Sequence, residues 1–171
     1  MRVNMRTVKV EDLSVEKFLP FGSYANYLNP QTEKIGAAPI EFFRDMVQQT
    51  LGAHTIASFS TCRVEKREPV IDVTEYHSTT GEVMLPLDRD ILIHVGPATP
   101  PGDEVPLDKI RVFRVPQGTL VSLRPGVWHH APFTLSDQPA NVLIVLPERV
   151  YANDCVVVLL EADARLRIEG V

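Results

Sequence analysis

Short runs of β-branched and aliphatic residues, separated by turn residues, make up most of the chain after residue 56. The runs cover residues 57–64, 70–77, 82–87, 90–95, 109–115, 120–123, 141–146, 154–160 and 165–168. Runs of this length with turn signals between them are typical of an antiparallel β-sandwich or β-barrel. The 14 prolines among 171 residues also disfavour a helical protein, because proline breaks helix interiors. We therefore expect a mainly β fold with few short helices.

The length of the chain suits one domain. Its 171 residues lie within the range of a single hydrophobic core, and neither a linker nor an internal repeat divides them. We predict one domain over residues 1–171, in which residues 57–171 form the barrel core and residues 1–56 cover one face of it.

The covering segment admits two local structures. Ile40, Phe43, Val47 and Leu51 recur at the spacing of an amphipathic helix, which predicts a short helix over residues 40–52. Residues 41–47 of the same stretch could also form an edge strand.

Charge and cysteine content narrow the class of function. The net charge of −5 disfavours binding to nucleic acid or to an anionic membrane surface. No apolar run approaches the roughly 18 residues that span a bilayer, and the start of the chain lacks a signal-type apolar segment. Cys62 and Cys155 are far apart and do not form a CxxC pair, so we expect reduced structural thiols. These features predict a cytoplasmic protein that acts on a small molecule.

Two groups of histidines and carboxylates have a spacing that suits a binding site. Glu75 and His77 lie two positions apart in a predicted strand, so their side chains share one face of the sheet. Glu82 follows a predicted tight turn and opens the next strand close to His77. His129 and His130 are consecutive, so only one of them can face a barrel interior. The alternative is a surface hairpin whose charged residues face solvent.

Four other residues have weaker signals. His54 and His94 have no carboxylate partner at site spacing, and we interpret both as structural. Arg63 lies on a strand that enters the barrel and is a candidate to bind a substrate carboxylate, although an exposed strand arginine is an equal alternative. Trp128, the single tryptophan, is a candidate to bind substrate, although we favour packing in the core or in an interface.

Both groups lie in stretches that resemble the metal-binding motif of cupins, which are small β-barrels. That motif is HxH, four residues and Glu, followed later by Gly, five residues and PxGxxH. The first stretch is Glu75-x-His77-(four)-Glu82, with Glu in place of the first His. The second is Gly118-(five)-Arg124-x-Gly126-x-x-His129, with Arg in place of Pro. This spacing selects His129 over His130.

The chain also resembles one cupin family, the ureidoglycolate lyases, along most of its length. The similar stretches are Phe18-Leu-Pro-Phe21-Gly22, Ser60-Thr-Cys-Arg63, Met84-Leu85-Pro86, Gly126-Val-Trp-His-His130 and Ala152-Asn-Asp-Cys155. The resemblance implies a cupin-like antiparallel β-barrel, or double-stranded β-helix, and a strand near Phe43. It also implies cleavage of ureidoglycolate to glyoxylate and urea in purine or allantoin breakdown.

The resemblance implies a set of roles for the site residues. His77, Glu82 and His129 are the expected ligands of a divalent metal, for which Ni, Zn, Mn and Fe all remain open. Glu75 and His130 are the expected proton-transfer residues. Phe42 and Phe43 in the covering segment supply apolar surface that a single chain would leave exposed, so we also expect a homodimer.

Two departures from the family pattern leave a rival function open. The family usually has Gln where Glu82 stands, and an Asn-Tyr pair in the stretch here occupied by Val121-Ser122-Leu123. The second departure leaves the fold intact but removes a hydrogen-bonding tyrosine from the pocket rim. The rival is a cupin-fold protein that binds another small anionic metabolite, or a metal-dependent isomerase or dioxygenase.

Overall fold

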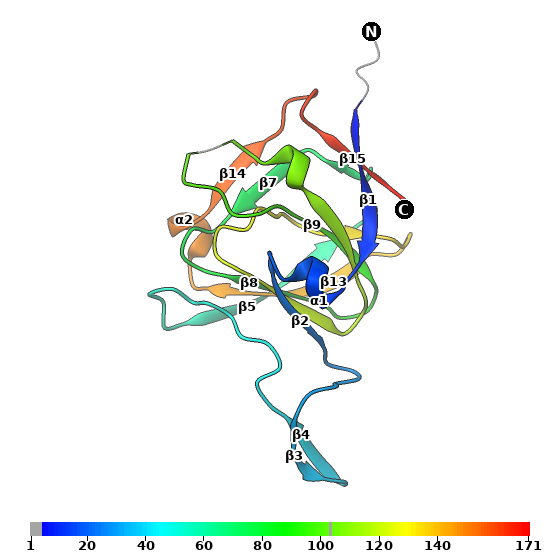
Figure 1. Ribbon diagram of the computed structural model, residues 1–171, viewed down its shortest axis with the longest axis vertical. Coiled ribbons are helices and arrows are strands. Elements are labelled where there is room, and N and C mark those ends of the chain that lie inside the picture. Colours follow the sequence, from blue (N-terminus) through cyan, green and yellow to red (C-terminus); the bar gives the residue numbers. More distant parts are fainter. Residues whose placement is uncertain (1–4, 103) are drawn as a thin grey trace.

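The computed structural model describes residues 5–102 and 104–171. Residues 1–4, where the sequence was read for a targeting signal, lie outside this part. Two curled sheets form a cupin-like β-barrel, as expected (Figure 1). One sheet has the order β12 (Phe133–Thr134), β9 (Ile91–Val95), β10 (Arg111–Val115), β1 (Arg6–Asp12), β15 (Leu166–Glu169) and β6 (Val70–Ile71). The other has the order β2 (Gly22–Asn26), β11 (Thr119–Leu123), β8 (Glu82–Pro86), β13 (Ala140–Pro147) and β5 (Ala57–Val64).

Two smaller pairs of strands complete the β structure. β14 (Val156–Leu159) pairs with β7 (Val73–Tyr76), and β3 (Lys34–Ala37) pairs with β4 (Ile40–Phe43). Helical segments are short: α1 (Val15–Phe18), the 3-10 helix η1 (Leu107–Lys109) and α2 (Val150–Asn153). In the described chain, no helix has the length and apolar character needed to cross a membrane.

The first 56 residues contribute to the barrel itself, which differs from the expected covering role. β1 lies between β10 and β15 and runs parallel to both, whereas the other strand pairs of the described chain are antiparallel. β2 extends the second sheet beside β11. Neither strand has a strong sequence signal, because charged residues interrupt the apolar positions of β1 and β2 is short and polar.

The hydrophobic core has two parts because β9 is buried on both faces. Alternate residues Ile91, Ile93 and Val95 pack between the two sheets against side chains of β8, β11 and β13. Leu92 faces the other way, into a second cluster that contains Trp128. Burial of such side chains stabilises the fold by roughly 1.5–3 kcal/mol each. The site described below lies where this frame brings strands from different sheets together.

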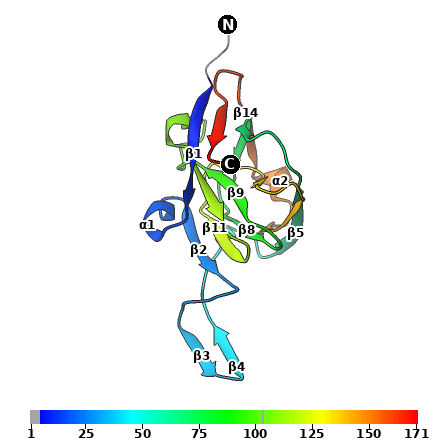
Figure 2. The same ribbon diagram turned by 90° about the vertical axis from the view of Figure 1, so that its right-hand side faces the viewer.

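The hairpin β3–β4 projects away from the barrel in both views (Figures 1 and 2). The strand expected around Phe43 is confirmed as β4, and the alternative helix over residues 40–52 is wrong. Ile35 and Phe42 are opposite each other across the hairpin, and their exposed fractions are 56% and 62%. A short amphipathic helix needs a surface against which to bury its apolar face, and no such surface lies beside this projecting segment.

Candidate metal centre

Alternation along β7 places two functional side chains on one face. Tyr76 points into the second core cluster, where its ring meets the Trp128 ring edge-on at a centroid distance of 4.6 Å. Thr74 is also fully buried. Glu75 and His77 therefore point to the opposite face, as the sequence spacing predicts.

The turn after His77 leads to a different sheet. β7 pairs with β14, whereas β8 lies between β11 and β13, so residues 78–81 do not close the hairpin that we expected. The Asp154 carboxylate fixes this crossing: it accepts hydrogen bonds from the Ser78 and Thr79 amides at 2.6 and 2.8 Å. Glu82 nevertheless begins β8 next to His77, and it is 5% exposed.

His129 reaches the same place from a third segment. Gly126 has a φ of 79°, a left-handed conformation that favours glycine, and its amide donates to the His77 carbonyl at 2.7 Å. Two backbone hydrogen bonds then join residues 129 and 75: the His129 amide donates to the Glu75 carbonyl at 2.8 Å, and the Glu75 amide donates to the His129 carbonyl at 2.6 Å. The chain thus holds His129 directly beside β7.

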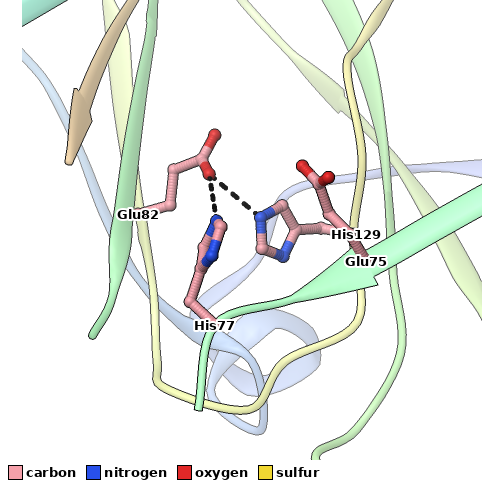
Figure 3. Close-up of side chains that lie close together, drawn as sticks. All are labelled: Glu75, His77, Glu82 and His129. Carbon is pink, nitrogen blue, oxygen red and sulfur yellow. Dashed lines mark hydrogen bonds and ion pairs between the residues drawn. The ribbon is translucent and has the colours of Figure 1, made fainter. Parts of the chain in front are cut away.

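Figure 3 shows the resulting cluster of four side chains, with both imidazoles directed at the Glu82 carboxylate. Glu82 Oε2 lies 3.1 Å from His77 Nε2 and 3.0 Å from His129 Nε2. One potential ligand atom from each of Glu75, His77, Glu82 and His129 lies within 4.8 Å of the other three. We refer to these four residues as the His–Glu cluster.

Backbone carbonyls fix the direction of both rings. His77 Nδ1 lies 2.6 Å from the Asp154 carbonyl, and His129 Nδ1 lies 2.7 Å from the Val127 carbonyl. Each Nδ1 therefore carries a proton and donates it, so Nε2 is the ring nitrogen that faces the cluster centre; it donates to Glu82 when protonated and can bind a metal when it is not. This arrangement around histidines is common in metal sites.

The electrostatics of the cluster reflect burial and close charges. Burial by itself would raise the pKa of Glu82, but the charge and hydrogen bonds of His129 and His77 outweigh it and hold the pKa at about 2. Burial opposes the charged form of His129 in the same way, yet the Glu82 carboxylate raises the pKa of His129. Glu82 is therefore an ionised carboxylate inside the barrel, which is uncommon unless the charge is paired or bound to a metal.

These residues fit a divalent metal ion. Two donor atoms that each lie about 2.1 Å from one ion are about 3.0 Å apart when their bonds meet at about 90°. The two nitrogen-to-oxygen separations of 3.0 and 3.1 Å match that value. Two imidazoles with one or two carboxylates suit Zn, Ni, Mn or Fe, and the two carboxylates would balance the charge of a divalent ion.

Three predicted site residues lie elsewhere. Trp128 is 1% exposed and donates its indole N–H to Thr99 Oγ1 at 3.0 Å, so it packs in the core, which is the interpretation that we favoured over substrate binding. Arg63 is exposed on the face of β5 opposite Cys62, whose side chain packs against the core. His130 is not a member of the His–Glu cluster, and its Nδ1 is buried without a partner in the described chain.

The two remaining histidines differ from each other. His94 is fully buried, and its Nε2 lies 3.2 Å from Thr74 Oγ1, which itself donates to the His129 carbonyl. Burial lowers the pKa of His94 to about 3, so it is neutral and supports the backbone of His129. His54 lines a polar surface cavity of about 390 Å³ that does not include the His–Glu cluster.

Sequence reasoning missed several residues that border the cluster. The Cys155 thiol donates to Glu75 Oε2 at 3.6 Å, and burial together with the Glu75 charge raises the pKa of Cys155 to about 12. Asp154 orients His77 through its carbonyl, as described above. The signal for both residues was present in Ala152-Asn-Asp-Cys155, which we noted as a resemblance without assigning a role.

Arg67 is a further residue that the sequence did not single out. Its guanidinium lies 3.7 Å above the Phe133 ring centroid and donates to the Ala131 carbonyl at 3.0 Å. Arg67, Cys62 and also Arg63 line a cavity of about 330 Å³ between β5 and the segment that follows His130. Burial and the charge of Glu82 raise the pKa of Cys62, and the charge of Arg67 opposes them.

The stretch that departs from the family pattern is buried. Val121 and Leu123 belong to the core between the sheets, and Leu123 is opposite Glu82 in the sheet register. The Ser122 hydroxyl donates to the Gln48 carbonyl at 2.9 Å. The one polar side chain of this stretch is therefore hydrogen-bonded to the N-terminal segment.

Known proteins resemble this chain in sequence and in fold. A ureidoglycolate lyase from Brucella melitensis is 26% identical to it, over 98% of this chain and 97% of that protein. A ureidoglycolate lyase from Rhodobacter capsulatus is 28% identical, over 73% of this chain and 77% of that protein. A dTDP sugar isomerase from Desulfovibrio desulfuricans has a similar fold, with a TM-score of 0.51, 16% identity, and coverage of 85% of this chain and 89% of that one. The family model described as ureidoglycolate lyase matches residues 5–167. Because that match spans nearly the whole barrel, the chain belongs to the ureidoglycolate lyase family.

Proposed function

We propose that this protein cleaves ureidoglycolate to glyoxylate and urea at a divalent metal held by the His–Glu cluster. The observation that carries the proposal is the cluster itself: two oriented imidazoles and an ionised carboxylate converge inside the barrel of a ureidoglycolate lyase family member. His77, Glu82 and His129 are the proposed ligands. The family match favours this activity over the rival isomerase, dioxygenase or non-catalytic binder.

The reaction requires one proton to move within the substrate. The substrate hydroxyl loses its proton, its C–O bond becomes the aldehyde C=O, the C–N bond breaks, and the urea nitrogen takes up a proton. A bound divalent ion would lower the pKa of the substrate hydroxyl. We assign the proton transfer to Glu75, whose carboxylate lies in the cluster and whose Oε2 accepts from Cys155. His130, outside the cluster, is the weaker candidate.

The substrate carboxylate needs a positively charged partner in addition to the metal. We propose Arg67 in place of Arg63, because its guanidinium is held near Cys62 by the Phe133 ring and the Ala131 carbonyl. A guanidinium that is oriented in this way loses less conformational freedom when it binds a carboxylate. Arg63 lines the same cavity, but in the described residues no ring or carbonyl contact orients its exposed side chain.

The activity assay separates this proposal from its rival. The purified protein is supplied in turn with Mn, Ni, Zn and Fe, and the release of urea and of glyoxylate from ureidoglycolate is measured. We expect equal amounts of the two products with at least one metal. The lyase proposal fails if no metal supports urea release.

We also propose that the protein is a homodimer that acts in the cytoplasm. The exposed apolar side chains of Ile35, Ile40 and Phe42 on the projecting hairpin support an interface between two chains. Cys62 and Cys155 are both free thiols, which is typical of a reducing compartment. Light scattering at micromolar concentration tests the dimer, and a mass near that of one chain would contradict it.

A further inference from the structure

The short helix α2 is attached to the His–Glu cluster at its C-terminal end. Val150, its first residue, is fully buried in the core between the sheets. The Asp154 carbonyl accepts from His77 Nδ1 at 2.6 Å, and the Cys155 thiol reaches Glu75 at 3.6 Å. The position of α2 relative to two members of the cluster is therefore fixed by the fold.

Tyr151, the second residue of α2, lies beside the cluster and is itself exposed. Its ring lies edge-on to the His77 ring, with 6.4 Å between the centroids and 80° between the planes. Tyr151 is 64% exposed, so it contacts a buried member of the cluster and is also accessible from solvent. In the described residues, the phenol hydroxyl has no hydrogen-bond partner, and the ring contact with His77 is its link to the site.

The surroundings of Tyr151 favour the neutral phenol. Burial and then the charges of Glu82 and Glu75 raise the pKa of Tyr151 to about 12. At neutral pH the hydroxyl therefore keeps its proton. A protonated phenol next to the His–Glu cluster is a donor that suits a neutral oxygen acceptor of a ligand.

We propose that Tyr151 binds the substrate by donating a hydrogen bond to its ureido carbonyl oxygen. This inference rests on the proposed function, which places the hydroxyl and carboxylate of ureidoglycolate at the metal. With that end of the molecule held at the buried cluster, the ureido group can extend toward the exposed side chain of Tyr151, which contacts His77. Tyr151 thereby distinguishes ureido acids from simple hydroxy acids, because only a ureido acid offers the second acceptor.

A binding experiment with two stable probes tests this role. N-carbamoylglycine carries the carboxylate and the ureido group but has no hydroxyl, so it cannot be cleaved, whereas glycolate carries the hydroxyl and carboxylate without the ureido group. Their affinities for the metal-loaded protein are measured by calorimetry in the wild type and in Tyr151→Phe. Tyr27→Phe is the matched control, since Tyr27 is 43% exposed and lies outside the cluster.

We expect Tyr151→Phe to weaken N-carbamoylglycine binding about tenfold, which is the effect of one lost hydrogen bond, and to leave glycolate binding and metal content unchanged. Tyr27→Phe should match the wild type with both probes. Equal affinity of wild type and Tyr151→Phe for N-carbamoylglycine, an equal loss for both probes, or no binding of N-carbamoylglycine by the wild type would each overturn the inference. A wild type that binds N-carbamoylglycine through Tyr151 but releases no urea would refute the proposed lyase activity and retain the Tyr151 site.

Discussion

The His–Glu cluster and the β3–β4 hairpin depart from the usual distribution of side chains in opposite directions. In the cluster, His77, Glu82 and His129 are 1%, 5% and 2% exposed although all three are polar. In the hairpin, Ile40 and Phe42 are 79% and 62% exposed although both are apolar. Buried polar groups and exposed apolar patches are the informative exceptions in a folded protein, because each costs stability unless it has a partner.

The difference between the two regions indicates what each partner is. Backbone carbonyls orient both imidazoles of the cluster, which supports the proposal that its partner is a small ion. The hairpin is long, projecting and joined to the barrel at its base, which supports the proposal that its partner is a protein surface (Figure 2). Substitutions in the cluster should therefore affect chemistry, and those in the hairpin should affect assembly.

The largest effect is expected from His129→Ala. Loss of this imidazole removes a proposed metal ligand and should reduce kcat/KM for ureidoglycolate at least about 100-fold. The thermal unfolding transition should change much less than the activity, and His54→Ala serves as the control because His54 lies on the surface cavity. Since removal of a buried side chain also destabilises, His129→Gln is the second variant: retained activity in a folded His129→Gln protein would argue against a ligand role.

Part of this cluster was accessible from the sequence because its spacing is local. Glu75, His77 and Glu82 lie within one strand, one turn and the start of the next strand, and alternation along a strand puts Glu75 and His77 on one face. His129 is distant from them in sequence, and the resemblance to the cupin motif is what joined it to the other three. Asp154 and Cys155 could not be placed, because their contacts join residues that are distant in sequence.

The fold was predictable where apolar runs are continuous and not elsewhere. β5 spans the run expected over residues 57–64, and β9 and β13 differ from expectation by a residue or so at their ends. β1 was missed because its sequence mixes charged and apolar residues, and its stability depends on parallel neighbours from distant parts of the chain. The hairpin was ambiguous because apolar residues at helical spacing do not form a helix without a surface to cover.

A second, smaller effect should follow from Asp154→Asn. The carboxylate accepts hydrogen bonds from two amides and from the Thr79 hydroxyl, and an amide side chain cannot accept all of them equally well. The carbonyl that orients His77 should then move, and we expect metal affinity and activity to fall about 10- to 100-fold. Titration of the metal-free protein measures the change, with Asp137→Asn, an exposed ion-pair residue, as control. Equal metal affinity in wild type and Asp154→Asn would show that the turn does not position His77.

Arg67→Lys and Arg63→Lys form a matched pair at the border of the site. A lysine cannot reproduce the planar fork that binds a carboxylate, so Arg67→Lys should raise KM about tenfold with little change in kcat. Arg63→Lys should alter KM less than about twofold, because Arg63 is exposed on the outer face of β5. The reverse order of effects in steady-state kinetics would restore Arg63 as the carboxylate partner.

Phe42→Asp should have the smallest effect on catalysis and the clearest effect on assembly. A charge at this exposed position costs little in the single chain but disfavours an apolar interface. Light scattering should show a dimer for the wild type and a single chain for the variant, while kcat/KM stays within about twofold. If the Phe42→Asp protein is still a dimer, the hairpin is not part of the interface. A large loss of activity would show that the hairpin and the His–Glu cluster are coupled.

The most direct test of the central claim is the metal content of the purified protein, measured by elemental analysis in the wild type and in His129→Ala. If the His–Glu cluster is a metal centre, the wild type should hold about one divalent ion per chain, and folded His129→Ala should hold far less. Equal metal content in the two proteins, or a wild type that binds none of Mn, Ni, Zn and Fe, would contradict the account.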